Sequence, residues 1–200
     1  MKEYDYIKRE IKNLLDADRY IHSLGVEKEA VKLGERYGVD IEKCKTAALI
    51  HDCQKNLKDK DLIEKALFYR INIDKIQIKS PQLLHGPVGA LYSKEKFEID
   101  DEDILNAVYY HTTGRDNMSM LEKIIYIADI IEENRNYFKG LDEIRNQAYI
   151  DINKALIMSA DSTITYILQR KNLIHPLTIE FRNSLILEVE SYEKKEKKSF

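Results

Sequence analysis

Apolar residues recur at helical spacing along almost the whole chain, and this pattern constrains the fold more than any other sequence feature. The stripe nearest the N-terminus consists of Ile7, Ile11, Leu14 and Leu15. Later stripes follow Asp40, Asp101 and Ser119, which are residue types suited to capping a helix. Only seven glycines and three prolines are present in 200 residues, so few positions break such helices. The sequence therefore predicts an all-α fold.

One segment does not follow the helical spacing. Between residues 71 and 78 isoleucines alternate with polar residues, which predicts an extended connector rather than a true strand. No glycine- or proline-rich linker divides the chain. We therefore expect a single helical domain over residues 1–190, followed by a charged C-terminal tail over residues 191–200.

Charge and composition exclude several classes of protein. Thirty-two basic residues against 35 acidic ones give a net charge of -3, so a nucleic acid polymer is not an expected partner. Cys44 and Cys53 are too far apart for a Cys-x-x-Cys pair and do not form a disulfide framework. The N-terminus lacks an apolar signal segment, and no apolar run reaches the ~20 residues that a membrane span needs. We expect a cytoplasmic protein.

Polar side chains interrupt the apolar pattern at two places. An apolar run ends in the adjacent pair His51-Asp52, and Asp129 lies inside the apolar segment of residues 124–131. A buried carboxylate is costly unless a cation or several donors meet it, so such a residue is either paired or a metal ligand. The other candidates on separate predicted helices are His22, His85 and His111. Imidazoles and carboxylates together suit iron, manganese or zinc.

Other catalytic patterns are absent from the sequence. There is no His-Glu-x-x-His, no Glu-x-x-His, no Walker A loop and no Gly-x-Gly-x-x-Gly. A Gly-x-Ser-x-Gly elbow is also missing, although composition alone does not exclude a Ser-His-Asp triad.

The ordered set His22, His51-Asp52, His85, His111 and Asp129 resembles the HD-domain metal-dependent phosphohydrolases. The surrounding segments resemble the YqeK-type symmetrical bis(5'-nucleosyl)-tetraphosphatases within that superfamily; they cover residues 19–26, 51–55, 84–90, 110–115 and 121–132. The likeness extends over roughly residues 15–175. One departure is Glu133, where the subgroup leads us to expect proline.

This resemblance implies a single HD-domain helical bundle that cleaves diadenosine tetraphosphate to two ADP at an iron-containing site. Another divalent metal is an alternative, with one or two ions. The implied metal ligands are His22, His51, Asp52 and Asp129. The implied catalytic residues are Asp52, Lys55, His85 and His111. The implied substrate-binding residues are Arg19, His22, Lys55, Asn56, Leu57, Lys58, His85, His111, Thr112, Asp129, Arg135, Lys171, Asn172, Leu173, Ile174, His175 and Pro176.

Two alternatives remain open at the level of sequence. The ligand set is shared by HD phosphohydrolases that act on a nucleoside monophosphate, a deoxynucleoside triphosphate or a cyclic dinucleotide. A catalytically silent nucleotide-binding module is the other alternative, although the intact ligand set argues against it. The resemblance also makes a homodimer plausible, and it leaves open whether His85 and His111 bind a second metal or phosphate.

Overall fold

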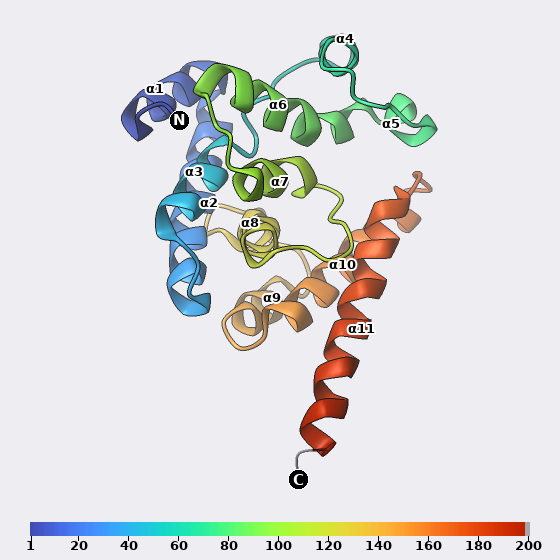
Figure 1. Cartoon of the computed structure of the whole chain (residues 1–200). Helices are drawn as coiled ribbons and strands as arrows, with labels where there is room; N and C mark the ends of the chain where they lie inside the picture. Colours follow the sequence, from blue (N-terminus) through green and yellow to red (C-terminus); the bar gives the residue numbers. More distant parts are fainter. Residues whose placement is uncertain (199–200) are drawn as a thin grey trace.

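The computed structural model describes residues 1–198, which contain eleven α-helices, one 3-10 helix and no strand (Figure 1). The all-α prediction is therefore confirmed. In chain order the elements are α1 (Tyr4–Leu14), α2 (Ala17–Tyr37), α3 (Ile41–Ile50), α4 (Asp59–Phe68), α5 (Lys75–Lys79), η1 (Pro81–Leu84), α6 (His85–Phe97), α7 (Glu102–Tyr110), α8 (Met120–Ile131), α9 (Leu141–Ala148), α10 (Ile152–Gln169) and α11 (Pro176–Lys198).

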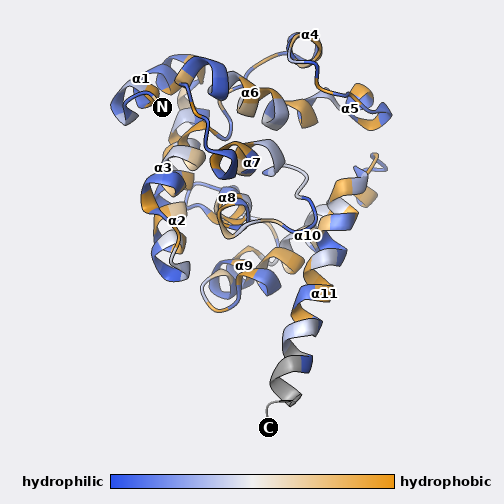
Figure 2. Cartoon of the chain, viewed as in Figure 1, coloured by the Kyte–Doolittle hydropathy of each residue, from blue (hydrophilic) through white to orange (hydrophobic). Residues whose placement is uncertain are grey.

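Helix α8 is the centre of the bundle and packs against α2, α3, α7, α9 and α10 (Figure 1). Its surroundings explain why its sequence is nearly all apolar, because neighbours cover it on most sides. The two charged residues of its first turns are buried as well, and both are paired. Glu122 accepts two hydrogen bonds from Arg115, and Lys123 lies 2.6 Å from Glu188 of α11. In the outer helices polar and apolar residues lie on different faces (Figure 2).

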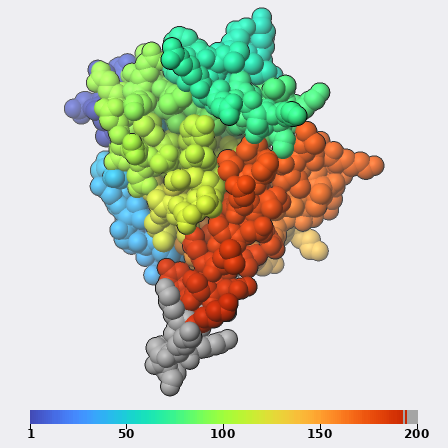
Figure 3. Space-filling model, turned by 45° about the vertical axis from the view of Figure 1, so that its right-hand side comes forward, coloured from blue at the N-terminus to red at the C-terminus, as the bar shows by residue number. Residues whose placement is uncertain are grey.

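The C-terminal helices close one side of the bundle. In the space-filling view the orange and red segment lies directly against the yellow-green residues of the middle of the chain (Figure 3). Tyr126 of α8 and Phe181 of α11 stack with ring centroids 4.7 Å apart. Where α11 begins, Nε2 of His175 donates to the Asp74 carboxylate at 2.7 Å, which joins this end to α5. The first turns of α11 are therefore packed against the rest of the bundle.

Capping residues start the helices where the sequence predicts them. The side chains of Asp40, Asp101 and Ser119 each accept a hydrogen bond from a backbone N–H in the first turn of the following helix. The extended connector was predicted too long, because residues 75–79 form α5. Asp74 and Gln77 make a reciprocal capping box there, and this local closure overrides the alternating isoleucines.

The fold also bears on the N-terminal apolar stripe, on membrane-spanning helices and on the C-terminal tail. Leu14 does not complete the N-terminal stripe, because it is exposed while Ile7 and Ile11 are buried. None of the described helices is both long and apolar enough to cross a membrane. Helix α11 continues past residue 190 to Lys198, residues 199–200 of the predicted tail lie outside the described residues, and the domain boundary stays a prediction.

Candidate metal centre

Four histidines from four parts of the bundle surround the carboxylate of Asp52. His22 belongs to α2, His51 follows the last residue of α3, His85 opens α6 and His111 follows α7. Their Nε2 atoms lie 3.9, 3.6, 3.1 and 3.5 Å, respectively, from an Asp52 oxygen. All five residues are buried. Side chains separated by up to 89 positions, the span from 22 to 111, therefore meet at one point.

The same kind of local hydrogen bond orients three of these imidazoles. Nδ1 of His51, His85 and His111 each contacts the carbonyl oxygen of the residue three positions earlier, at 2.6 Å for His51 and 2.7 Å for His111. Because a carbonyl oxygen only accepts, Nδ1 must carry the proton. Nε2 is then left with a lone pair that faces the centre. This is the arrangement that metal-binding histidines adopt, with the outer nitrogen fixed by a hydrogen bond.

His22 is oriented by a carboxylate rather than by a carbonyl. Its Nδ1 lies 3.1 Å from Oε1 of Glu132, which is almost fully buried. The backbone N–H of Asn134 donates to the other oxygen of Glu132 at 2.6 Å. Gly25 leaves the space for this carboxylate, because a Cβ there would lie 2.3 Å from Glu132 Oε2. Nε2 of His22 lies 3.0 Å from Asp129 Oδ1 yet makes no hydrogen bond.

A glycine also lets the α6 and α7 histidines approach each other. A Cβ at Gly86 would lie 2.9 Å from the carbonyl oxygen of Tyr109, so only glycine allows this contact between the helices. The Nε2 atoms of His85 and His111 lie 2.9 Å apart. With both protons on Nδ1, two lone pairs face each other at that distance. A cation or a shared proton between them removes the repulsion.

Three cationic side chains border the carboxylates. Arg19 donates to Asp52 at 2.9 Å, and Arg135 donates to Asp129 at 3.3 Å. The Lys55 Nζ lies 3.5 Å from the ring nitrogens of His85, and burial lowers the pKa of this lysine. The site thus combines buried anionic ligands with positive charge at its edge, which suits an anionic ligand that approaches a cation.

Burial and charge set the protonation states of the centre in opposite directions. Burial lowers the pKa of His51 to about 4 and also lowers the pKa of His85, so both are neutral at pH 7. Burial opposes ionisation of Asp52, but the groups around it outweigh burial and hold the pKa of this carboxyl well below the usual range. For His22, burial is outweighed by Asp129 and Glu132, which raise its pKa, as expected where a cation belongs beside two carboxylates.

The depressed pKa of His51 predicts a pH-dependent stability of the metal-free protein. Between its ordinary pKa of 6.5 and its folded-state value of about 4, the unfolded chain binds more protons. The free energy of unfolding should therefore fall by up to about 3 kcal/mol as the pH drops through that window. Denaturant unfolding at pH 7, 6, 5 and 4, with chelator present, measures this change. The His51→Gln variant should lose that part of the slope; parallel pH profiles for the two proteins would contradict it.

The donor set fits a divalent metal ion. Ligand atoms of His22, His51 and Asp129 lie within 4.8 Å of one another, and so do those of His51, Asp52 and His111. The Nε2 atoms of His22 and His51 are buried and have no hydrogen-bond partner. Buried polar atoms are nearly always satisfied, so such unpaired nitrogens beside ionised carboxylates fit the ligands of a cation. The two groups overlap at His51.

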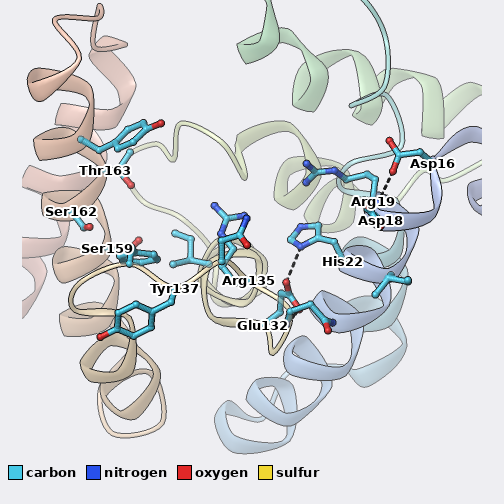
Figure 4. Close-up of a pocket in the computed structure, with 16 residues that line it drawn as sticks. Asp16, Asp18, Arg19, His22, Glu132, Arg135, Tyr137, Ser159, Ser162 and Thr163 are labelled. Carbon is cyan, nitrogen blue, oxygen red and sulfur yellow. Dashed lines mark hydrogen bonds and ion pairs between the residues drawn. The ribbon is translucent and has the colours of Figure 1, made fainter.

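A large pocket opens from this centre. It has a volume of about 1050 Å³ and lies between the start of α2, the segment after α8, and α10. Figure 4 shows Arg19 and His22 on one side of it, Ser159 and Thr163 on the other, and Arg135 between them. A pocket of this size accommodates a nucleotide.

The structure does not gather all the predicted substrate-binding residues around this pocket. Asn56, Leu57 and Lys58 follow Lys55 in the turn before α4, and the Asn56 side chain donates to Asp16 at 2.6 Å. None of residues 171–176 lines the pocket. His175 is buried, and its two ring nitrogens contact Asp74 and the backbone N–H of Leu177. The imidazole of His175 is therefore engaged within the fold.

Sequence reasoning missed two kinds of residue. Glu132 carries no role in the predicted ligand set, although a carboxylate three residues after Asp129, at the end of an apolar run, was a usable signal. Ser159, Ser162 and Thr163 line the pocket, but hydroxyls on an amphipathic helix give no signal in the sequence. Their position depends on the packing of α10 beside α8.

Comparison with known proteins gives evidence on the family that is independent of this geometry. The HD domain profile matches residues 19–134. The symmetrical bis(5'-nucleosyl)-tetraphosphatase of Halalkalibacterium halodurans is 42% identical over 89% of this chain and 94% of its own length. The Bacillus subtilis protein of the same name is 39% identical over 88% and 94%. A Clostridium acetobutylicum crystal structure, described as a predicted HD superfamily hydrolase involved in NAD metabolism, is 47% identical with a TM-score of 0.91, covering 94% and 99% of the two chains.

Proposed function

The chain belongs to the HD-domain family, and from this premise we propose that it hydrolyses diadenosine tetraphosphate symmetrically to two ADP. The observation that carries the proposal is the Asp52 carboxylate with four imidazole Nε2 atoms between 3.1 and 3.9 Å from it. Two close relatives that carry the name of this activity, each covered over 94% of its length, support the substrate.

The metal ligands in this proposal are His22, His51, Asp52 and Asp129. A divalent metal held by these residues would supply Lewis-acid chemistry toward the phosphate and would lower the pKa of a water molecule. The chain contributes the orientation of the ligands: the Nδ1 hydrogen bonds hold each imidazole in the tautomer that leaves Nε2 free to coordinate.

Positive side chains bind the polyphosphate. Arg19 and Arg135 each contact a site carboxylate through one terminal nitrogen, and the rest of each guanidinium is suited to phosphate oxygens. Lys55 adds a point charge next to His85, and Thr112 places a hydroxyl 3.3 Å from His85 Nε2. The three cations neutralise the charge that builds up on the phosphoryl oxygens during transfer, and the Thr112 hydroxyl can donate a hydrogen bond to one of them.

The reaction needs one proton acceptor and one bond cleavage. A water oxygen bonds to one of the two central phosphorus atoms, and the bridging P–O bond breaks. The bridging oxygen leaves on the second ADP. The water proton passes to the Asp52 carboxylate or to Nε2 of His85 or His111. Burial keeps His85 neutral, so its Nε2 is available as a base. A phosphate leaving group is a weak base, so these residues serve mainly to orient it.

Several finer features stay predictions. Iron is the expected metal, ADP the expected product, the cytoplasm the expected location and a homodimer the expected assembly. Residues 55–58 and 171–176 are proposed to bind one nucleotide half of the substrate. The contact of Lys55 with His85 at the metal centre supports the first of these segments.

The test of the proposed function is purification without oxygen, elemental analysis, and an assay over a substrate panel. The panel contains diadenosine tetraphosphate, a nucleoside monophosphate, a deoxynucleoside triphosphate, a cyclic dinucleotide and NAD, the last because of the description of the Clostridium protein. We expect diadenosine tetraphosphate to give the highest kcat/KM, in proportion to bound metal. A higher kcat/KM for any other member of the panel would overturn the assignment.

Replacing Lys55 should impair catalysis without removing the metal. Lys55→Met keeps the aliphatic stem and deletes the charge beside His85, so kcat/KM should fall roughly 10- to 100-fold. Metal content should stay at the wild-type level. Lys60→Met is the matched control, because Lys60 is exposed and pairs only with Glu64 among the described contacts. Equal kinetics for the two variants would rule out the role given to Lys55.

A further inference from the structure

The large pocket is continuous with the metal centre but extends well beyond it. Arg19, His22 and Arg135 line it at one end, and each of them contacts the carboxylate of Asp52 or Asp129. The other end is formed by α10 and the segment that follows α8 (Figure 4). A ligand whose phosphates reach the two arginines would therefore place its remaining groups against α10.

A buried hydroxyl at the α10 end lacks a partner. Ser159 is 1% exposed and lines the pocket, and its Oγ makes no hydrogen bond. A buried hydroxyl normally finds a partner, so an unpaired one at a pocket wall indicates a group that the ligand supplies. Ser162 and Thr163 add two more hydroxyls on the same wall. Ribose hydroxyls and the edge of a base are ligands that such a wall would bind.

Two aromatic rings border the same end of the pocket. Tyr137 and Tyr166 are 71% and 54% exposed although both line it. Arg170 lies 4.6 Å from the ring centroid of Tyr166. Large exposed aromatic rings beside a polar pocket are suited to stacking on a planar base, which covers apolar surface that is otherwise left in water.

Diadenosine tetraphosphate has an adenosine at each end of its phosphate chain, so cleavage at the centre requires room for two nucleosides on different sides of the reacting phosphorus. Residues 171–176, proposed for one of them, do not line this pocket. We propose that the pocket between Arg19, Arg135 and α10 is the subsite for the second nucleoside, with Ser159 bonded to it and Tyr166 stacked on its base. This inference rests on the proposed function.

The test compares diadenosine tetraphosphate with adenosine 5'-tetraphosphate, which has the same phosphates and only one nucleoside. Ser159→Ala and Tyr166→Ala should each lower kcat/KM for the dinucleotide by about tenfold. With adenosine 5'-tetraphosphate the loss should stay within about twofold, because its nucleoside occupies the other subsite. Leu168→Ala is the matched control, since Leu168 is an exposed residue of the same helix that does not line the pocket.

Stability provides a second readout. Because the Ser159 hydroxyl has no partner, its removal should leave the free energy of unfolding unchanged. Equal losses with both substrates, or no loss with either, would overturn the subsite. Failure of the proposed function appears differently: the wild-type protein would then form no ADP from diadenosine tetraphosphate, and the subsite would fall with it.

Discussion

The Asp52→Asn variant is expected to lose at least about 10³-fold in the rate of diadenosine tetraphosphate hydrolysis. Among residues 1–198, Asp52 is the one carboxylate within 4 Å of the Nε2 atoms of all four site histidines, and it also accepts from Arg19. The amide has nearly the same shape but no charge, so it binds a cation poorly and accepts a proton poorly. Initial rates and metal content, measured on the same preparation, check this expectation.

Asp161→Asn is the control for this variant. Asp161 also pairs with an arginine, Arg182, at 2.7 Å, but on the exposed face of the bundle. Its loss should leave activity and metal content unchanged, since exposed ion pairs contribute little. If the Asp52 variant kept full activity and full metal content, the central role of this residue would be wrong.

Replacing Glu132 should weaken metal binding roughly 10- to 100-fold, although Glu132 is not a proposed ligand. Its carboxylate holds Nδ1 of His22 at 3.1 Å, and the neutral amide of Glu132→Gln cannot stabilise the imidazole in the same way. The measurement is competition for the metal against a chelator of known affinity. Activity at saturating metal should recover most of the wild-type value, which separates a positioning role from a catalytic one.

Two further variants sharpen this prediction. Glu133→Gln changes the adjacent glutamate, which is exposed and pairs with Lys28, and should bind metal like the wild type. Gly25→Ala keeps the glutamate at position 132 but puts a Cβ 2.3 Å from its Oε2. The carboxylate must therefore shift from its position beside His22. The Gly25 variant should therefore weaken metal binding as Glu132→Gln does. Wild-type metal affinity in both Glu132→Gln and Gly25→Ala would show that His22 needs no such support.

The sequence predicts most of the fold because the signals for these helices are local. Caps at Asp40, Asp101 and Ser119 are hydrogen bonds within one turn, and apolar spacing shows which face is buried. The error at residues 75–79 has the same origin. Two isoleucines flanking Gln77 read as alternation, whereas the capping box with Asp74 closes a short helix.

The candidate site also contains residues that the sequence reveals and residues that only the packing of helices reveals. Histidines and aspartates that interrupt apolar stripes are visible in one sequence, and the structure brings six of them together. Ser159 is not visible as part of the site, because its role arises where α10 packs beside α8. The pocket depends on the distance between helices that are far apart in the chain, and no spacing rule reports that distance.

The most direct test of the account is hydrolysis of diadenosine tetraphosphate by the metal-loaded protein in ¹⁸O-labelled water, with every product identified by mass spectrometry. Attack on one of the two central phosphorus atoms predicts ADP alone, with one ¹⁸O in half of the molecules and none in the rest. The same preparation stripped of metal should give no product. Formation of ATP and AMP, or turnover that persists without metal, would contradict symmetrical cleavage at the His–Asp centre.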